Sequence, residues 1–247
     1  MKCAVGVTTY NVLAGLRIDL LEQTIRSIEK AFPDAVLCLL DNGSTDGTDC
    51  LVQNLTTTRW HTTTAGKTWG TDNFTPGMGR NRLGGYMDKV CCDPWGVNYD
   101  SELAGQYFFV WSDDDMLWKE GAQHKLSQFW GASPEEREHI AILGGLLEPV
   151  WHWNTPRHTV EAGGVRVLVR DSCPGAAWSF DNLRVVWPLS QGHATFGYDH
   201  KTCSRLAVAG VPVAQMDLAD HIGWEASTHG NEAIKDSKPL DRAKWGV

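Results

Sequence analysis

Apolar runs and helical patterns alternate along the first half of the chain. Cys3–Thr9 and Ala35–Leu40 are short, continuous and apolar, as buried strands are. Between them, apolar side chains recur every three or four residues from Ile18 to Phe32, which predicts an amphipathic helix. Asp19 is its expected N-cap, with Glu22 three residues later. A short helix follows the second strand, and this order predicts a right-handed βαβ unit with parallel strands.

The second half continues the alternation with shorter segments. Further helices are predicted over 78–90, 120–130 and 198–209, and further strands over 107–111, 140–147, 165–169 and 211–216. We expect an α/β fold with a mixed, mostly parallel central sheet flanked by helices. No repeat or low-complexity linker divides the sequence, which favours a single domain over residues 1–247.

Composition and charge narrow the class of protein. The 247 residues are 42% apolar and 21% charged, which is ordinary for a globular protein. The net charge of −8 argues against a surface that grips nucleic-acid backbones non-specifically. No apolar run approaches the roughly 20 residues that cross a bilayer, and the first residues enter a predicted strand directly. We therefore expect a cytoplasmic protein without membrane contact, whose seven cysteines are reduced.

Polar clusters follow three of the predicted strands, at Thr8–Asn11, Asp41–Asp46 and Ser112–Asp115. Ligands of open α/β sheets bind beyond the carboxyl ends of the strands. We therefore expect the three clusters to form one site at one edge of the sheet.

Asp113, Asp114 and Asp115 are consecutive carboxylates that repel one another, and burial increases the cost of their charge. Mn²⁺ or Mg²⁺ relieves this repulsion, because both take oxygen ligands and share them between carboxylates and substrate phosphates. In an extended segment Asp113 and Asp115 point to the same side, so they are the expected metal ligands. The alternative is an acidic first turn of a helix, which is favourable to the helix dipole.

In order and spacing, these motifs resemble those of the GT-A glycosyltransferases, especially the family 2 group. The resemblance covers roughly residues 3–130 and rests on four segments: Thr8–Asn11, Asp41–Thr48, Gly77–Asn81 and Asp113–Asp115. It implies the GT-A (Rossmann-like) fold and metal-dependent transfer of a sugar from a nucleotide-sugar to an acceptor hydroxyl. A UDP-sugar is the expected donor.

The resemblance also implies roles for residues in the first half. Thr8, Tyr10 and Asp41 would contact the base and the ribose, and Asp46 and Arg80 would shape the nucleotide and sugar pocket.

For the acidic triplet the resemblance implies a division of roles. Asp113 would meet the ribose or a metal-bound water, Asp115 the metal, and Asp114 the sugar. His221, which follows a predicted strand, would complete the metal shell together with Asp113 and Asp115.

The second half resembles the same family at Phe196–His200, Ala209–Val213 and Asp220–His221. Asp199, at the start of a helix, matches the position of the base that deprotonates the acceptor, which implies an in-line, inverting displacement. The alternative for Asp199 is a helix N-cap.

Two further segments are candidates for substrate contacts. The loop Ser172–Trp178 resembles one that lines the donor sugar, with Gly175 and Trp178 as its contacts, although an ordinary turn is an equal alternative. Trp151–Trp153 is a candidate aromatic platform, or an edge strand with one Trp packed inward.

On this interpretation, residues 1–115 form a nucleotide-binding half, 116–230 an acceptor and catalytic half, and 231–247 a tail. Other functions left open are a sugar nucleotidyltransferase, a metal-dependent phosphohydrolase and a non-catalytic sugar-binding module. The acceptor is open among a glycan, a small molecule and a hydroxymethylated DNA base. DNA would need a basic groove, with these candidates: Arg80, Arg82, Lys89, Arg157, Arg166, Arg170 and Arg184.

Overall fold

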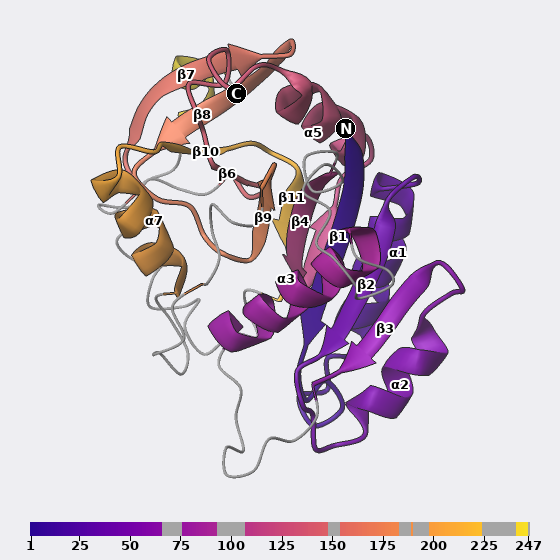
Figure 1. Cartoon of the computed structure of the whole chain (residues 1–247). Coiled ribbons are helices and arrows are strands. Elements are labelled where there is room, and N and C mark those ends of the chain that lie inside the picture. The colour runs from indigo at the N-terminus through magenta and orange to yellow at the C-terminus, as the bar shows by residue number, and fades with distance from the viewer. Residues whose placement is uncertain are drawn as a thin grey trace.

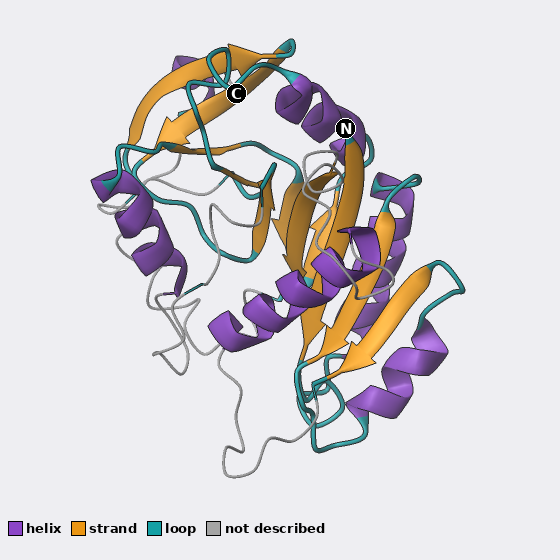
Figure 2. Ribbon diagram, viewed as in Figure 1, coloured by secondary structure: helices purple, strands orange, loops and turns teal. Residues whose placement is uncertain are grey.

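The fold is taken from a computed structural model that describes residues 1–65, 76–92, 107–147, 154–182, 189, 198–223 and 241–246. In these residues a nine-stranded sheet with helices on both faces forms the main structure (Figures 1 and 2). The predictions for Trp151–Trp153 and Arg184, and for most of the tail, lie outside the described residues.

The first half of the sheet is parallel, as predicted. Its strands lie in the order β3-β2-β1-β4, and every neighbouring pair among them is parallel. The bounds are β1 Lys2–Thr9, β2 Val36–Asp41, β3 Trp60–Thr64 and β4 Tyr107–Asp113. All four carboxyl ends therefore lie at the same edge of the sheet, which is the lower edge in Figure 1.

The second half of the sheet is mixed. Beyond β4 the order continues β9-β6-β10-β8-β7, in which only β6 and β10 are parallel neighbours. The bounds are β6 Ile142–Gly144, β7 Pro156–Ala162, β8 Val165–Arg170, β9 Ala177–Phe180 and β10 Val213–Gln215. A separate antiparallel pair joins β5 (Met116–Trp118) to β11 (Ala219–His221).

The two faces of the sheet carry two hydrophobic cores. Helices α1 (Ile18–Ala31) and α5 (Ala122–Gly131) pack on one face, and α3 (Pro76–Cys92) and α7 (Tyr198–Val208) on the other. Strand β4 contributes to both cores because its side chains alternate: Phe108 and Val110 face α1, whereas Phe109 and Trp111 face α3. Two short helices complete the described elements, α2 (Thr48–Leu55) and α9 (Arg242–Trp245).

The start of α1 differs from its prediction. Arg17, not Asp19, is the N-cap residue, and no side chain caps the helix. Asp19 lies inside the first turn, where a negative charge still suits the helix dipole. Glu22 pairs with Arg26 one turn on instead of reaching back to the cap.

Several strands were not predicted, most of them because they are too short to show a clear apolar pattern. They are β5, β7, β9 and β11, and all but β7 have three or four residues. Among the described residues, no helix combines the length and apolar character that crossing a membrane requires.

Candidate functional site

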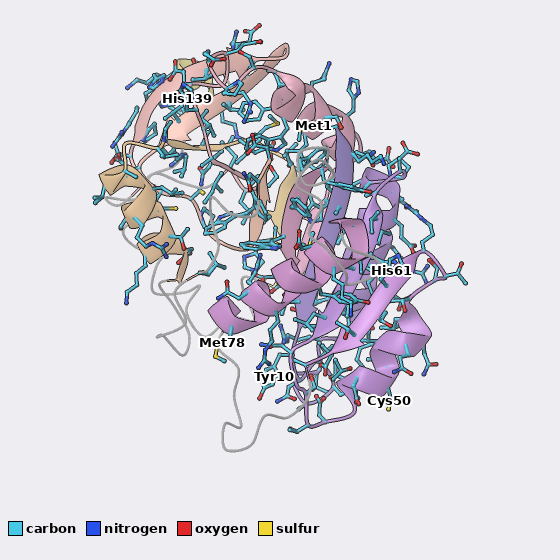
Figure 3. The ribbon with its side chains drawn as sticks, in the orientation of Figure 1. Met1, Tyr10, Cys50, His61, Met78 and His139 are labelled. Carbon is cyan, nitrogen blue, oxygen red and sulfur yellow. The ribbon has the colours of Figure 1, made fainter. Side chains whose placement is uncertain are left out.

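The three polar clusters meet at the carboxyl ends of β1, β2 and β4. In the sheet register Thr9 lies beside Asp41 on β2, and Thr8 lies beside Asp113 on β4. Tyr10 follows directly, and it lies at the opposite end of β1 from Met1 (Figure 3). Thr8 Oγ1 is buried and has no hydrogen-bond partner within the described part of the chain, so one polar atom of this cluster is unsatisfied.

Asp41 is a fully buried carboxylate held by its own turn. Ser44 donates to it from the backbone N–H, at 3.2 Å, and from the hydroxyl. Burial raises the pKa of Asp41, and the hydrogen bonds from Ser44 offset part of that increase. An acceptor in this position fits the predicted contact with an N–H of a base.

Asp46 links the loop after β2 to the loop between β1 and α1. Its carboxylate accepts hydrogen bonds from the backbone N–H of Ala14 at 2.7 Å and from the backbone N–H and hydroxyl of Thr48, at 3.0 and 2.6 Å. Both oxygens are thus committed within the protein. Asp46 can shape the pocket by fixing the loop between β1 and α1, but the carboxylate is not directed at a ligand.

The acidic triplet divides according to the alternation of β4. Asp113 continues the α3 side of the strand and forms an ion pair with Arg80 of α3. Arg80 also donates to the carbonyl of Ala176, at 3.3 Å, so it ties α3, the end of β4 and the loop before β9 together. Burial raises the pKa of Asp113, and the Arg80 guanidinium offsets part of this increase.

Gly79, in the predicted Gly-Arg-Asn element, allows α3 to approach the strands closely. A Cβ atom at this position would lie 2.7 Å from Asn42 Nδ2 and 3.0 Å from Thr8 Cγ2. The glycine therefore brings the first turn of α3, with Arg80, to the ends of β1 and β2.

Asp114 points to the other face of the sheet. It accepts from the Thr9 hydroxyl at 2.7 Å and from Arg17 Nη1 at 3.1 Å, so each of its oxygens has a partner inside the protein. Burial raises the pKa of Asp114 to about 6, against the lowering effect of Arg17. The strand alternation thus turns Asp114 toward α1, and its contact with the sugar stays a prediction.

Asp115 meets His221 across the β5–β11 pair. Asp115 Oδ2 lies 3.1 Å from His221 Nε2, and the Ile222 backbone N–H donates to the Asp115 carbonyl at 3.0 Å. Asp115 Oδ1 is buried and has no hydrogen-bond partner among the residues that the structure describes. A carboxylate with one unused, buried oxygen fits the oxygen ligands that Mn²⁺ and Mg²⁺ prefer, and the adjacent imidazole adds one nitrogen donor.

The predicted metal ligands are not assembled as a set of three. Within the described residues, no group of three or more His, Cys, Asp or Glu side chains is placed to hold a metal ion. Asp115 and His221 are adjacent, whereas Asp113 is engaged by Arg80. Two protein ligands are compatible with a cation that takes its remaining oxygens from phosphates and water.

The loop before β9 runs along the inner side of α7. The Gly175 backbone N–H donates to Asp199 Oδ2 at 3.3 Å, and Cys203, one turn further along α7, donates to the Cys173 carbonyl at 3.9 Å. Gly175 and Asp199 are thus neighbours, and Asp199 is half-buried. Asp199 lies in the first turn of α7, where its charge also suits the helix dipole.

Trp178 is not a loop residue. It lies within β9, is fully buried and stacks on Trp111 of β4 with a centroid separation of 6.2 Å. Its ring is part of the same core as Leu83 and Met87 of α3, and its contact with the donor sugar stays a prediction.

Most of the candidate DNA contacts that the structure describes are buried or paired within the protein. Arg80 is buried against Asp113, Arg157 pairs with Asp171, and Arg166 pairs with Glu161. Arg170 is buried and donates to the Asn154 carbonyl at 2.8 Å. Burial lowers the pKa of Arg82, whereas Lys89 is exposed near the end of α3.

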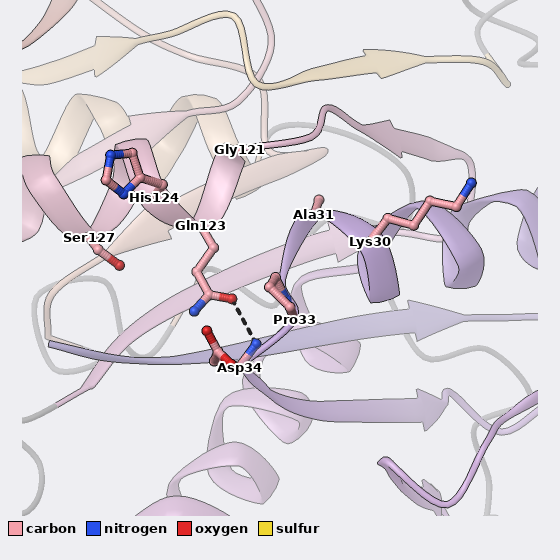
Figure 4. A pocket seen from close by; sticks show the side chains of 8 residues that line it. All are labelled: Lys30, Ala31, Pro33, Asp34, Gly121, Gln123, His124 and Ser127. Carbon is pink, nitrogen blue, oxygen red and sulfur yellow. Dashed lines mark hydrogen bonds between the residues drawn. The ribbon is translucent and has the colours of Figure 1, made fainter.

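A surface hollow of about 350 Å³ lies away from all these residues, where α1 ends and α5 begins (Figure 4). The Asp34 backbone N–H and Gln123 Oε1 bridge it at 3.2 Å. It lies beyond the end of α1 remote from Arg17, so it carries none of the predicted site chemistry.

Sequence reasoning missed Arg17 and Gly223. A cation at the N-cap of a helix opposes the helix dipole, so Arg17 at this position indicates a partner such as Asp114. For Gly223 the sequence carried no signal, because its contact with Asp115 depends on the pairing of β5 with β11.

Two solved structures of similar fold contain a bound nucleotide or nucleotide-sugar. A mannosyltransferase from Pyrobaculum calidifontis, in complex with GDP-Man and Mn²⁺, matches with a TM-score of 0.52 and 15% identity, over 97% of this chain and 66% of its own. S. aureus TarS 1-349 in complex with UDP matches with a TM-score of 0.54 and 14% identity, over 99% and 68%. The chain thus spans about two thirds of their length and shares their GT-A type fold. No family model and no curated protein sequence matches.

Proposed function

We propose that this protein is a glycosyltransferase that moves a sugar from a nucleoside diphosphate sugar, a UDP-sugar as the default, to an acceptor hydroxyl. The observation that carries the proposal is the arrangement at the ends of β1, β2 and β4. Buried Asp41, the Asp113–Arg80 pair and the Asp115–His221 pair follow neighbouring strand ends in a fold shared with such enzymes.

The donor would bind across these strand ends. Asp41 would accept from a base N–H, with Thr8 and Tyr10 on the adjoining strand end. Asp115 and His221 would hold a divalent cation, with Asp113 at most joining through water. When bound, the cation neutralises charge on the leaving diphosphate.

Asp199 is the proposed base. It would take the proton of the acceptor hydroxyl while that oxygen forms a bond to the anomeric carbon and the bond to the diphosphate breaks. Attack from the side opposite the diphosphate inverts the anomeric configuration. The contact between Gly175 and Asp199 supports this role, because it holds the carboxylate beside the loop that leads to Arg80 and Asp113.

The acceptor is proposed to be a glycan or a small molecule with a free hydroxyl. Hydroxymethylated DNA is less favoured, since most of the described basic candidates are buried or paired within the protein. A screen of acceptors would include hydroxymethylated DNA beside glycans and small molecules.

The test combines donor hydrolysis, transfer and binding. Wild type with Mn²⁺ and a panel of UDP- and GDP-sugars should release nucleoside diphosphate, faster when an acceptor is present. Asp115→Asn should lose Mn²⁺-dependent nucleotide binding. Asp199→Asn should keep binding within about twofold and lose about 10²–10⁴-fold in kcat.

Asp220→Asn is the matched control, because Asp220 adjoins His221 but is exposed and pairs with Lys119. It should behave as wild type. Failure of the wild type to bind any nucleoside diphosphate would overturn the proposal. Formation of nucleotide-sugar from a nucleoside triphosphate and a sugar phosphate would indicate a nucleotidyltransferase instead.

A further inference from the structure

The loop between β1 and α1, residues 10–17, enters the proposed donor site with Tyr10 at its start. On one side it is bonded to the loop after β2. The Asn11 backbone N–H donates to Ser44 Oγ at 2.8 Å, the Thr45 backbone N–H donates to Asn11 Oδ1 at 3.0 Å, and the Val12 backbone N–H donates to Thr48 Oγ1 at 2.9 Å. This side fixes the middle of the loop.

On the other side a single side chain fixes both ends of the loop. Arg17 donates from Nη2 to the Tyr10 carbonyl at 3.0 Å and from Nη1 to Asp114 at 3.1 Å. The Arg17 backbone N–H also donates to the Val12 carbonyl at 2.9 Å. The loop is therefore closed on itself and anchored to the acidic triplet through one guanidinium.

Asp114 is built for this internal contact. Its side chain is 9% exposed, that of Arg17 is 31% exposed, and the second oxygen of Asp114 accepts from Thr9. Both oxygens of Asp114 therefore have partners within the protein. Its charge holds Arg17, and Arg17 in turn holds the backbone of Tyr10.

We propose that Arg17 is a positioning residue for the donor: the Arg17–Asp114 pair sets the position of Tyr10 relative to the acidic triplet. The inference rests on the proposed function, since it concerns binding of the same nucleoside diphosphate. The guanidinium forms two directed bonds to two different groups, which the single ammonium of a lysine cannot reproduce.

The test uses Arg17→Gln, Arg17→Lys, Asp114→Asn and the double variant Arg17→Gln/Asp114→Asn. Binding of UDP with Mn²⁺ is measured by calorimetry, and donor KM and kcat are measured separately. Arg17→Gln should raise Kd and KM about tenfold, or about 1.4 kcal/mol, with kcat within twofold. Arg17→Lys should recover only part of this lost affinity. The Kd of the double variant should be no higher than that of the single variant that binds UDP more weakly.

Arg26→Gln is the control, because Arg26 lies on the same helix in an exposed pair with Glu22. It should match wild type, and thermal unfolding checks that every variant is folded. Unchanged Kd in Arg17→Gln, with wild type binding UDP, would overturn this inference alone. A second result would also overturn it. If the increase in Kd of the double variant equals the product of the increases in the two single variants, Arg17 and Asp114 act independently, and Asp114 would then act on the ligand directly. If wild type binds no nucleoside diphosphate, the proposed function fails, and the inference fails with it.

Discussion

Gly223 lies against the carboxylate of Asp115, and a Cβ atom at position 223 would fall 2.6 Å from Asp115 Cγ. Gly223 follows β11, and Asp115 precedes β5, the strand that pairs with β11. The pairing of β5 with β11 thus places both His221 and Gly223, which has no side chain, next to the Asp115 carboxylate. Room at position 223 keeps Asp115 within reach of His221.

Gly223→Ala should therefore displace Asp115 and weaken Mn²⁺ binding. We expect the affinity for Mn²⁺ in the presence of UDP to fall at least about tenfold, or about 1.4 kcal/mol. Electron paramagnetic resonance of free Mn²⁺ measures this directly. Gly131→Ala is the control, since a Cβ atom there meets nothing within 4 Å. Normal Mn²⁺ affinity in folded Gly223→Ala would contradict the role given to this contact.

Trp178→Phe should reduce stability and leave donor binding intact. The indole is fully buried against Trp111, so a smaller ring leaves unfilled space in the core. We expect the free energy of unfolding to fall by about 1–3 kcal/mol. Urea denaturation measures this, and donor KM should stay within about twofold. A raised KM with unchanged stability would indicate that Trp178 contacts the donor.

The ion pairs of Asp217 predict a pH dependence of stability. Lys119 donates to Asp217 at 2.6 Å and Arg242 at 3.2 Å. Partial burial raises the pKa of Asp217, but the bonds and charges of Lys119 and Arg242 outweigh this and lower it. A carboxyl with a lowered folded-state pKa stabilises the fold above its unfolded pKa, about 3.9, and this contribution is lost as the pH falls through the folded pKa.

The Tm difference between wild type and Asp217→Asn should thus be present at neutral pH and vanish in strong acid. Calorimetry from neutral pH down to about one pH unit below the unfolded pKa of about 3.9 measures it. Asp241→Asn is the control, because it removes a helix cap in the same terminal segment. Its Tm difference from wild type should not show the pH dependence expected for Asp217→Asn. A difference for Asp217→Asn that grows toward acid would contradict the sign of the pKa shift.

Thiol reactivity should reflect burial. Among the six cysteines whose side chains the structure describes, only Cys50 is exposed. Burial raises the pKa of Cys3 and Cys38, and the neighbouring Cys91 adds to both shifts. In native protein, Cys50→Ser should remove one equivalent of fast reaction with a disulfide reagent. Fast reaction of unchanged amplitude in that variant would contradict the burial pattern.

The sequence could predict the parts of the site that depend on strand ends. Asp41 and Asp113 follow continuous apolar runs, and parallel pairing of β1, β2 and β4 brings their ends together without further information. Turn chemistry in Asp41–Thr48 was equally readable, since it is local.

The parts that could not be predicted depend on contacts distant in sequence. The contacts of Asp114 were not predicted, because its partners Thr9 and Arg17 lie about 100 positions earlier. Trp178 was assigned to a loop because nothing local shows that residues 177–180 pair with β4. Roles for Asp115, His221 and Asp199 remain predictions, since they depend on ligands.

Strand β9 lies between β4 and β6 and pairs with both, through Trp111–Trp178 on one side and Gly144–Trp178 on the other. The backbone hydrogen bonds of the sheet are therefore continuous from the donor-binding strands to the remaining strands. Rotation of one half against the other would break these hydrogen bonds, so the sheet works as a rigid frame. Changes of substrate are then best engineered by exchanging loops on a fixed frame, and cutting the chain into two separately expressed halves would leave β4 and β9 as unpaired, aggregation-prone edges.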